Sequence, residues 1–232
     1  MVVEAVLFDW GGTLTPWCPP DEQSWLRVAR RLVPAGAERA AAALAAAEFA
    51  VWQRCRLQQR SGTMAEIFTA AGIDPTPAAY DVFAAEVEHA THTDPEAVAL
   101  LTALHERGVR VGVLSNTTWT RAHHERIFAR DGVLELIDGA VYTSEIEVTK
   151  PHPAAFRSAM AAVGVTDPAR CVFVGDRTFD DIHGAGSVGM RTVLVPHSTI
   201  PATQRGHTDG VPDAVVRRLS ELLPVLDGWH HG

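Results

Sequence analysis

Five short runs of the chain are apolar at nearly every position and rich in β-branched residues. A run of this kind is typical of a parallel strand buried on both faces, because a half-exposed strand alternates apolar and polar residues. Helix-like stretches lie between the later runs, and this alternation predicts right-handed crossovers in an α/β fold with an open, doubly wound parallel sheet. The expected strands are Val2–Phe8, Val109–Leu114, Gly139–Thr143, Cys171–Val174 and Arg191–Val195, and the expected helices are Glu96–Glu106, Arg121–Arg130, Pro153–Val163 and Asp181–Val188.

The first run is followed by a long stretch, residues 16–94, that shows no strand pattern. It has the pattern of four helices, interrupted at proline and glycine positions. Because an ordinary crossover is much shorter, we expect a helical cap domain over residues 16–94, inserted after the first strand into a core domain of residues 1–15 and 95–232. The alternative is that these helices pack directly on the sheet. The expected helices are Asp21–Leu32, Ala37–Arg60, Thr63–Ala71 and Pro77–His92.

The composition of the chain excludes some classes of function. The chain has 232 residues and a formal net charge of −8, so it can bury a substantial core but lacks the basic balance that nucleic-acid binding favours. Its longest apolar stretch, Ala40–Ala47, is far shorter than the ~20 residues of a membrane span. Three widely separated cysteines and a first segment without a signal-peptide pattern lead us to expect a cytoplasmic protein with free thiols. We expect a small-molecule substrate as its partner, and no nucleic acid or membrane; the sequence does not give the oligomeric state.

Polar residues follow four of the expected strands at the point where each strand ends. Asp9 follows the first, Ser115 and Asn116 the second, Lys150 the third, and an acidic segment, residues 176–181, the fourth. Ligands bind at the carboxyl ends of the strands in such a sheet, so we expect these side chains to converge. Converging carboxylates favour a hard divalent cation. A carboxylate can also attack a phosphoryl group whose oxygens are neutralised by cations and hydrogen-bond donors.

Four motifs in this order resemble those of the haloacid dehalogenase (HAD) superfamily, and the resemblance covers the whole chain. Residues 9–15, with the sequence DWGGTLT, are similar to the first motif, Asp-x-Asp-x-Thr. Ser115 and Lys150, the only lysine in the chain, stand where the second and third motifs have their residues, and residues 175–181, GDRTFDD, resemble the fourth motif. The helical insertion is similar to the C1-type cap of the family. The resemblance implies a HAD-like hydrolase that acts through a covalent intermediate.

The resemblance also implies roles for individual residues. Asp9 would be the nucleophile, Ser115 would hydrogen-bond the transferred group, and Lys150 would offset negative charge on Asp9 and on the phosphoryl oxygens. Gly12 and Asn116, together with Lys150, are expected to bind the substrate. The implied cofactor is Mg²⁺. Its expected ligands are the carboxylate of Asp9, the carbonyl group of Gly11, Asp176 and Asp181, with Asp180 as the alternative to Asp181.

The chain departs from the family pattern at Gly11. Phosphatases of the family carry an aspartate at this position, two residues after the nucleophile, and it protonates the leaving alcohol and then activates water. A glycine carbonyl can still bind a metal, but no side chain is present to move a proton. Because general acid–base help is typically worth ~10²–10⁴-fold, efficient hydrolysis of alkyl phosphates is in question.

Three functions stay open at this point. We expect a Mg²⁺-dependent phosphatase of small organic phosphates. The first alternative is a metal-free 2-haloacid dehalogenase, which needs no proton donor but whose fourth motif lacks the acid present here as Asp176. The second is a non-catalytic protein that binds a phosphorylated ligand or a partner, which Gly11 favours. A phosphonoacetaldehyde hydrolase is excluded, because that branch uses a cap lysine and residues 16–94 contain none.

Other polar and aromatic candidates are assigned no chemistry. His123 and His124 lie in an expected helix, and we expect them to face solvent rather than bind a metal. Arg54 and Arg56 are expected to be solvated charges on a long helix. Core packing is the expected task for most tryptophans of the cap, which are Trp17, Trp25 and Trp52.

Overall fold

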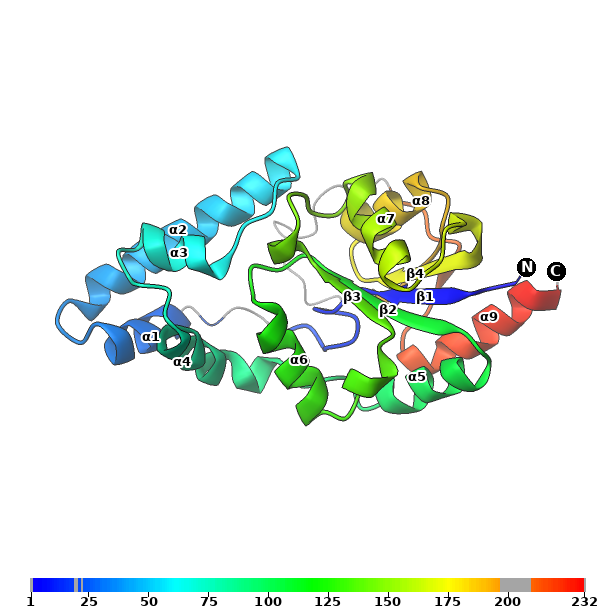
Figure 1. Cartoon of the computed structure of the whole chain (residues 1–232), viewed down its shortest axis with the longest axis horizontal. Coiled ribbons are helices and arrows are strands. Elements are labelled where there is room, and N and C mark those ends of the chain that lie inside the picture. The colour runs from blue at the N-terminus through cyan, green and yellow to red at the C-terminus, as the bar shows by residue number, and fades with distance from the viewer. Residues whose placement is uncertain (1, 19–20, 22, 197–209, 232) are drawn as a thin grey trace.

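The fold is built around one parallel sheet of six strands. The computed structural model describes residues 2–18, 21, 23–196 and 210–231, and Figure 1 shows their arrangement. The strand order is β3-β2-β1-β4-β5-β6, so that β1 lies between β2 and β4 at the centre of the sheet. This order confirms the predicted α/β architecture. The strands are β1 (Ala5–Phe8), β2 (Arg110–Ser115), β3 (Gly139–Tyr142), β4 (Cys171–Gly175), β5 (Arg191–Leu194) and β6 (Ala214–Val215).

Helices cover both faces of the sheet, because alternate residues of each strand point to opposite sides. In β1, Val6 and Phe8 belong to a buried cluster that includes residues of α5, α6 and α9, whereas Ala5 and Leu7 belong to a cluster that includes residues of α7 and α8. Burial on both faces explains why the strands are apolar at nearly every position. These helices are α5 (Ala97–Glu106), α6 (Arg121–Arg130), α7 (Pro153–Ala162), α8 (Gly184–Ser187) and α9 (Leu222–His231).

Some elements of the C-terminal half differ from the sequence predictions. The pattern predicts neither β6, which has only two residues, nor α9, which carries Pro224 in its first turn. A run of two residues is too short to show a periodicity, whereas proline in a first helical turn is tolerated. The single helix expected over residues 181–188 is instead a π-helical turn, η5 (Thr178–His183), that runs into α8. Such wide turns are frequent at functional sites.

Within the described residues, four α-helices between β1 and α5 form a unit with its own core, called the cap below. Their buried residues form a cluster of their own, and Figure 1 shows them at the end of the molecule opposite the chain termini. Trp25 and Trp52 pack against this cluster, as expected. Where the chain enters and leaves the cap, the Asp94 N–H donates to the Leu14 carbonyl at 2.7 Å. These features support domain boundaries at residues 16 and 94, which stay a prediction. The cap helices are α1 (Ser24–Leu32), α2 (Ala37–Gln58), α3 (Met64–Ala70) and α4 (Pro77–Val87).

Local sequence explains the ends of α2 and α3. α2 ends two residues earlier than predicted because Gln59 adopts the left-handed conformation, with φ 51°, a common way to end a helix. α3 begins after Thr63, whose side chain accepts a hydrogen bond from the Glu66 N–H at 3.2 Å. This bond satisfies one of the N–H groups that a first helical turn leaves unpaired. The segment between α2 and α3 is therefore a turn with an irregular backbone conformation.

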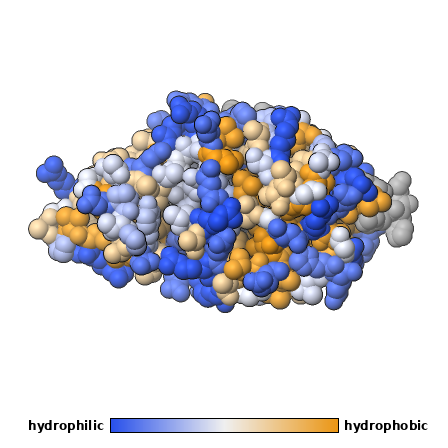
Figure 2. Space-filling model, viewed as in Figure 1, coloured by the Kyte–Doolittle hydropathy of each residue, from blue (hydrophilic) through white to orange (hydrophobic). Residues whose placement is uncertain are grey.

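The surface is mixed in character. On the face drawn in Figure 2, hydrophilic residues are interspersed with smaller hydrophobic areas. Phe49 and Leu57, two large apolar side chains that are exposed, both lie on α2. Scattered exposed apolar residues are ordinary on protein surfaces. Within the described residues, no helix combines the length and the apolar character that crossing a membrane requires.

The expectation that His123 and His124 face solvent is wrong. His124 is fully buried and His123 is 7% exposed, because this side of α6 faces the sheet and the cap rather than water. The His124 ring stacks on Tyr142 at a centroid distance of 4.4 Å, and its Nε2 lies 3.1 Å from the Thr117 hydroxyl. Burial lowers the pKa of His124 to about 3 and that of His123 to about 4. Both rings are therefore neutral at neutral pH.

We expect His124→Phe to weaken the dependence of stability on pH. The folded protein keeps this ring neutral, whereas the unfolded chain protonates it with a pKa near 6.5, so the free energy of unfolding falls as the pH drops below that value. At pH 5 the wild type loses about 2 kcal/mol in this way, and the phenylalanine variant does not. Urea unfolding at pH 7.5 and pH 5.0 measures the difference, with His92→Phe at an exposed position as the control. An equal pH dependence in wild type and His124→Phe would contradict the neutral burial of this ring.

Candidate active site

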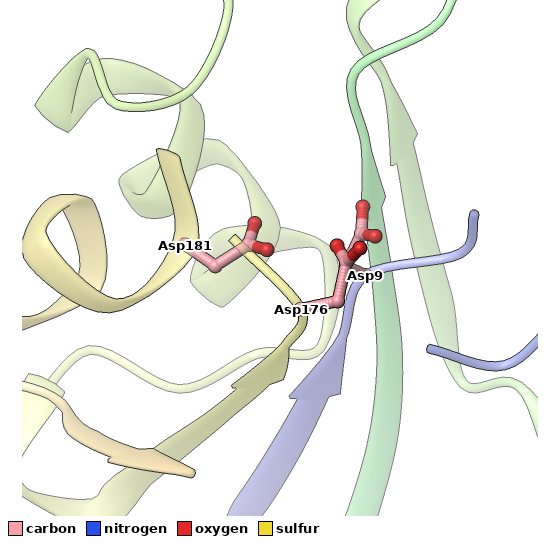
Figure 3. Close-up of side chains that lie close together, drawn as sticks. All are labelled: Asp9, Asp176 and Asp181. Carbon is pink, nitrogen blue, oxygen red and sulfur yellow. The ribbon is translucent and has the colours of Figure 1, made fainter. Parts of the chain in front are cut away.

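The carboxyl ends of β1 and β4 bring the predicted acidic residues together. Asp9 follows β1, Asp176 follows β4 and Asp181 lies in η5, and Figure 3 shows the three carboxylates converging. Each residue offers an oxygen, and these oxygens all lie within 4.8 Å of one another. All three residues are buried, Asp181 completely. Their proximity follows from the sheet, in which Phe8 of β1 is the direct neighbour of Val174 of β4.

Lys150 links two of these carboxylates. Its Nζ donates to Asp9 Oδ1 and to Asp181 Oδ1, each at 2.6 Å, and the residue is only 3% exposed. Burial opposes the charge on the amine, but Asp181 and Asp9 together outweigh it and hold the pKa of Lys150 above its ordinary value. The lysine that the sequence predicts at this edge of the sheet is therefore present and positively charged.

The charge on Asp9 depends on its neighbours. Burial raises the pKa of Asp9 to about 6, against the opposing effect of Lys150. The negative charge of Asp181 contributes to this rise in the pKa of Asp9. At pH 7.5 most Asp9 side chains are nonetheless ionised, so the residue can act as a nucleophile.

Asp181, and not Asp180, belongs to the acidic cluster. Its Oδ2 accepts a hydrogen bond from the backbone N–H of Arg177 at 2.9 Å. Gly175 makes room for this carboxylate, because a Cβ there would lie 2.4 Å from Asp181 Cγ. Since both Asp181 oxygens already accept hydrogen bonds, one of them from Lys150, the residue is well placed to hold the lysine. Sequence analysis did not identify the parts played by Gly175 and the Arg177 N–H, because one is a missing side chain and the other a backbone group.

Asp176 is a buried carboxylate beside Asp9 and Asp181. Among the described residues, neither of its oxygens has a hydrogen-bond partner, although Arg177 Nε lies 3.4 Å from Oδ2. Burial, with the charges of Asp9 and Asp181, raises the pKa of Asp176 well above its usual range. A buried carboxylate without donors is costly unless an ion or water satisfies it. Together with Asp9, it offers the oxygen ligands that a hard divalent cation prefers.

The two glycines that follow Trp10 have different surroundings. Gly12 has φ 95°, and a Cβ there would lie 2.4 Å from Asp176 Oδ2, so glycine is required for the loop to approach this carboxylate. A Cβ on Gly11 would meet nothing within 4 Å. The fold therefore has room for a Cβ two residues after the expected nucleophile, and the sequence provides none. Binding of the metal by the Gly11 carbonyl and of the substrate at Gly12 stay predictions.

Ser115 and Asn116 lie at the end of β2, beside the loop that carries Lys150. Ser115 is the last residue of β2 and is 2% exposed. The Asn116 Nδ2 donates to the Lys150 carbonyl at 3.1 Å, and its Oδ1 accepts from the Lys150 N–H at 2.8 Å. Through these contacts Asn116 positions the backbone of Lys150, a role that was not predicted from the sequence. The expected pairing of neighbouring strands does bring the ends of the second and third strands together. Direct contact of Asn116 with a substrate stays a prediction.

Comparison with known proteins gives a family match over most of the chain. The family model described as haloacid dehalogenase-like hydrolase matches residues 3–189. The chain is 33% identical over 132 residues to a Methanopyrus kandleri protein named glyceraldehyde 3-phosphate phosphatase, a match that covers 57% of this chain and 55% of that protein. It is 30% identical over 129 residues to a protein of Thermus thermophilus named phosphoserine phosphatase. This match covers 56% of this chain and 49% of that protein. The chain thus spans about half the length of the curated relatives it matches.

Solved structures share the fold over nearly the whole chain. A HAD phosphatase from Thermococcus onnurineus matches with a TM-score of 0.70 and 21% identity, covering 97% of this chain and 99% of that one. An L-2-haloacid dehalogenase from Xanthobacter autotrophicus matches with a TM-score of 0.66 and 23% identity, covering 98% of this chain and 99% of that one. At such low identity the likeness shows the fold alone, and two different chemistries share that fold. The choice between them rests on the side chains of the site.

Asp176→Asn is expected to stabilise the protein in the absence of metal. The substitution removes a buried charge that has no hydrogen-bond donor among the described residues, with Arg177 Nε 3.4 Å from Oδ2, a change on the order of 1–3 kcal/mol. Because the pKa of Asp176 is raised in the folded state, its ionisation costs stability as the pH rises above the ordinary value of 3.8. The gain in the variant should therefore be largest at alkaline pH and shrink as the pH falls. Thermal unfolding in EDTA between pH 5 and pH 8 measures it.

The same variant tests the cation site. Mg²⁺ should raise the unfolding midpoint of the wild type, because a ligand that binds only the folded state stabilises it, and should leave Asp176→Asn unchanged. Asp74→Asn, the same substitution at an exposed position of the cap, is the control and should respond to Mg²⁺ as the wild type does. An Asp176→Asn protein that keeps the full response to Mg²⁺ would show that the cation does not bind at this carboxylate.

Proposed function

Because the chain belongs to the haloacid dehalogenase-like hydrolase family, we propose that it is a Mg²⁺-dependent phosphatase of small organic phosphates. The observation that carries this proposal is Asp176, a buried carboxylate beside Asp9 for which the described part of the chain supplies no hydrogen-bond donor on either oxygen. A metal-free dehalogenase has no use for such a group, whereas phosphoryl transfer uses a cation beside the transferred group. The relatives named as phosphatases in Methanopyrus kandleri and Thermus thermophilus support the same class of reaction.

Asp9 is the nucleophile in the proposed reaction. One of its carboxylate oxygens attacks phosphorus, the bond between phosphorus and the leaving oxygen breaks, and an aspartyl-phosphate forms. Water then attacks phosphorus, the bond to Asp9 breaks, and inorganic phosphate leaves with the carboxylate restored. Lys150 favours the ionised form of Asp9 and offsets charge on the phosphoryl oxygens, while the hydroxyl of Ser115 and the backbone at Gly12 bind them.

The carboxylates of Asp9 and Asp176 and the carbonyl of Gly11 would hold Mg²⁺. When bound, the ion offsets the negative charge of the phosphoryl oxygens. Asp181 would stand beside these ligands and act chiefly on Lys150, since its two oxygens accept hydrogen bonds from the lysine and from a backbone N–H. The buried lysine and the metal would then neutralise the reacting group from two sides.

Gly11 makes the proposed reaction sensitive to the leaving group. No side chain at this position can protonate the leaving oxygen or take a proton from the attacking water, help that is typically worth ~10²–10⁴-fold. A leaving group with a low pKa departs without a proton, as in aryl and acyl phosphates. Substrates of this kind suit the site best, unless the substrate or the cap supplies the proton.

Asp9→Asn is expected to abolish phosphate release. The amide has nearly the shape of the carboxylate but is not a nucleophile, so hydrolysis of p-nitrophenyl phosphate and of metabolite phosphates should fall to the level without enzyme. The wild type and Asp74→Asn should both be active with Mg²⁺ and inactive with EDTA. Full activity in Asp9→Asn would contradict the covalent mechanism.

Gly11→Asp is expected to raise the hydrolysis of alkyl phosphates, by up to ~10²-fold, and that of p-nitrophenyl phosphate much less. A Cβ at this position would meet nothing within 4 Å, and the added carboxyl group supplies the missing proton donor, which matters most for poor leaving groups. Measuring kcat/KM for p-nitrophenyl, phenyl and alkyl phosphates gives the dependence of rate on leaving-group pKa, which should be steep in wild type and shallow in the variant. Gly11→Ala adds the Cβ without the acid and should keep the steep dependence. A dependence in Gly11→Asp as steep as in wild type would count against a missing acid as the limit.

Gly11 also favours a second candidate function, the metal-free 2-haloacid dehalogenase. A carboxylate can displace halide from carbon without a proton donor, and here no donor follows the nucleophile. Halide release from 2-chloropropionate in EDTA, lost in Asp9→Asn, would establish this activity in place of the phosphatase. Binding of phosphate esters by calorimetry without turnover of either substrate class would identify a non-catalytic binding protein.

A further inference from the structure

Arg177 is a second cation beside the acidic cluster, and the proposed reaction assigns it no task. Its Nε lies 3.4 Å from Asp176 Oδ2 without forming a hydrogen bond, and its side chain is 17% exposed. The positive charge lowers the pKa of Asp176, against the larger effect of burial. A guanidinium group is always charged in proteins and carries five N–H donors, so it can bind an anionic ligand in addition to its contacts within the chain.

The ring of Trp17 supports this guanidinium group. Arg177 Cζ lies over the ring, 5.2 Å from its centroid, a distance at which the face of an indole attracts a cation. Trp17 is half-buried, and its indole nitrogen is buried without a hydrogen-bond partner among the described residues. Core packing was the expected task for most tryptophans of the cap, and this one instead places a hydrogen-bond donor beside the arginine.

The two residues meet because β1 and β4 are neighbours in the sheet. The turn after β1 is closed by a bridge between Gly11 and Thr15, and Trp17 follows this bridge, where the chain leaves the site for the cap. Arg177 is held from the other strand, because its backbone N–H donates to Asp181 Oδ2 at 2.9 Å. The pair therefore lies at the border between core and cap, beside the carboxylates.

Displacement at phosphorus directs the rest of the substrate toward this border. Asp9 would attack from the end of β1, and the leaving oxygen stands roughly in line with the attacking one, so the remainder of an ester points away from the sheet and toward the cap. A group of the substrate beyond the ester oxygen would then lie near Arg177 and Trp17. If that group is anionic, it accepts charge-assisted hydrogen bonds, for which the planar guanidinium group is well shaped.

The proposed metal makes an anion at this place favourable. A Mg²⁺ ion bound to Asp176 would share this carboxylate with Arg177, whose Nε lies beside it, and two cations so close together repel each other. An anionic group of the substrate would offset this repulsion, whereas a neutral group would not. The arginine thus favours one class of substrate over another.

The arginines of α2 are less suited to this task. Arg54 donates to the Ser61 carbonyl at 2.8 Å and pairs with Glu66 of α3. Its side chain is 34% exposed, so it is not the fully solvated charge that we expected. Arg56 is exposed, as expected. Within the described residues, neither forms an ion pair with the acidic cluster.

We propose that Arg177 and Trp17 form a subsite for a second anionic group of the substrate, so that the protein acts on small phosphate esters that also carry a carboxylate or a second phosphate. Arg177 contacts that group, and Trp17 positions the guanidinium group and donates its indole N–H. This inference deepens the proposed function, on which it rests, by naming the class of ester.

Binding of ligands that cannot be hydrolysed tests the subsite in the intact protein. The ligand 3-phosphonopropionate carries a phosphonate and a carboxylate, and 3-phosphonopropionamide is a neutral counterpart of nearly the same shape. In calorimetry with Mg²⁺, the wild type should bind the acid about tenfold more tightly than the amide, a typical effect of a hydrogen bond between charged groups. A third ligand, ethane-1,2-diphosphonate, shows whether a second phosphate suits the subsite better than a carboxylate.

Variants assign the preference for the acid to its residues. Arg177→Gln should abolish the preference and leave binding of the amide nearly unchanged, because the backbone bond to Asp181 remains; unchanged binding of the amide also shows that the variant is folded. Trp17→Leu should reduce the preference, since the guanidinium group loses its support. Arg56→Gln, the same substitution at an exposed arginine of the cap, is the control and should keep the full preference.

Equal affinities for acid and amide in the wild type would overturn the subsite, as would a preference that survives Arg177→Gln. The phosphatase is judged separately, by release of phosphate from 2-phosphoglycolate and from p-nitrophenyl phosphate. A preference in binding without any turnover would refute the phosphatase and leave the subsite, whereas turnover without the preference would do the reverse.

Discussion

The buried charge of Lys150 is the interaction on which the rest of the site depends. In an environment closed to water, an isolated carboxylate binds a proton and an isolated amine loses one, and Lys150 prevents both by lying between Asp9 and Asp181. Removing one member would leave an uncompensated buried charge. Several otherwise unrelated features serve this arrangement, among them the Asn116 side chain on the lysine backbone and the missing side chain of Gly175. The strands of the sheet position the charged residues, and the interactions of these residues restrict the conformations of the loops that carry them.

Asp176 is arranged in the opposite way. Where Lys150 is paired with two carboxylates, this carboxylate is buried without a hydrogen-bond donor among the described residues. A Cβ at Gly12 would collide with it, so the loop lies against Asp176 only because residue 12 is glycine. A feature that lowers stability in the free protein is expected where a ligand completes the structure. The site therefore combines the charge of Lys150, which is balanced within the chain, with the charge of Asp176, which is left for a bound ligand to balance.

The strands that carry the site could be predicted because each is an apolar run that ends abruptly at a polar residue, as β1 does at Asp9. The burial of His124 could not, because it depends on packing against Tyr142 and against Trp10, which is distant in sequence. The link between Asn116 and Lys150 involves backbone groups, on which side-chain composition carries no information. Sequence reasoning thus finds which residues gather at the sheet edge, and misses how their loops are held.

The chain has a single lysine among its 232 residues, and that lysine is 3% exposed. Arginine and histidine consequently supply all the basic side chains elsewhere, and no side-chain amine stands on the outside of the molecule for acylation, conjugation or amine-directed cross-linking. Apart from the α-amino group, the one amine that such reagents can modify is that of Lys150, buried against Asp9 and Asp181. The rate at which reagents label Lys150 would therefore report how often local opening exposes the interior of the molecule to solvent.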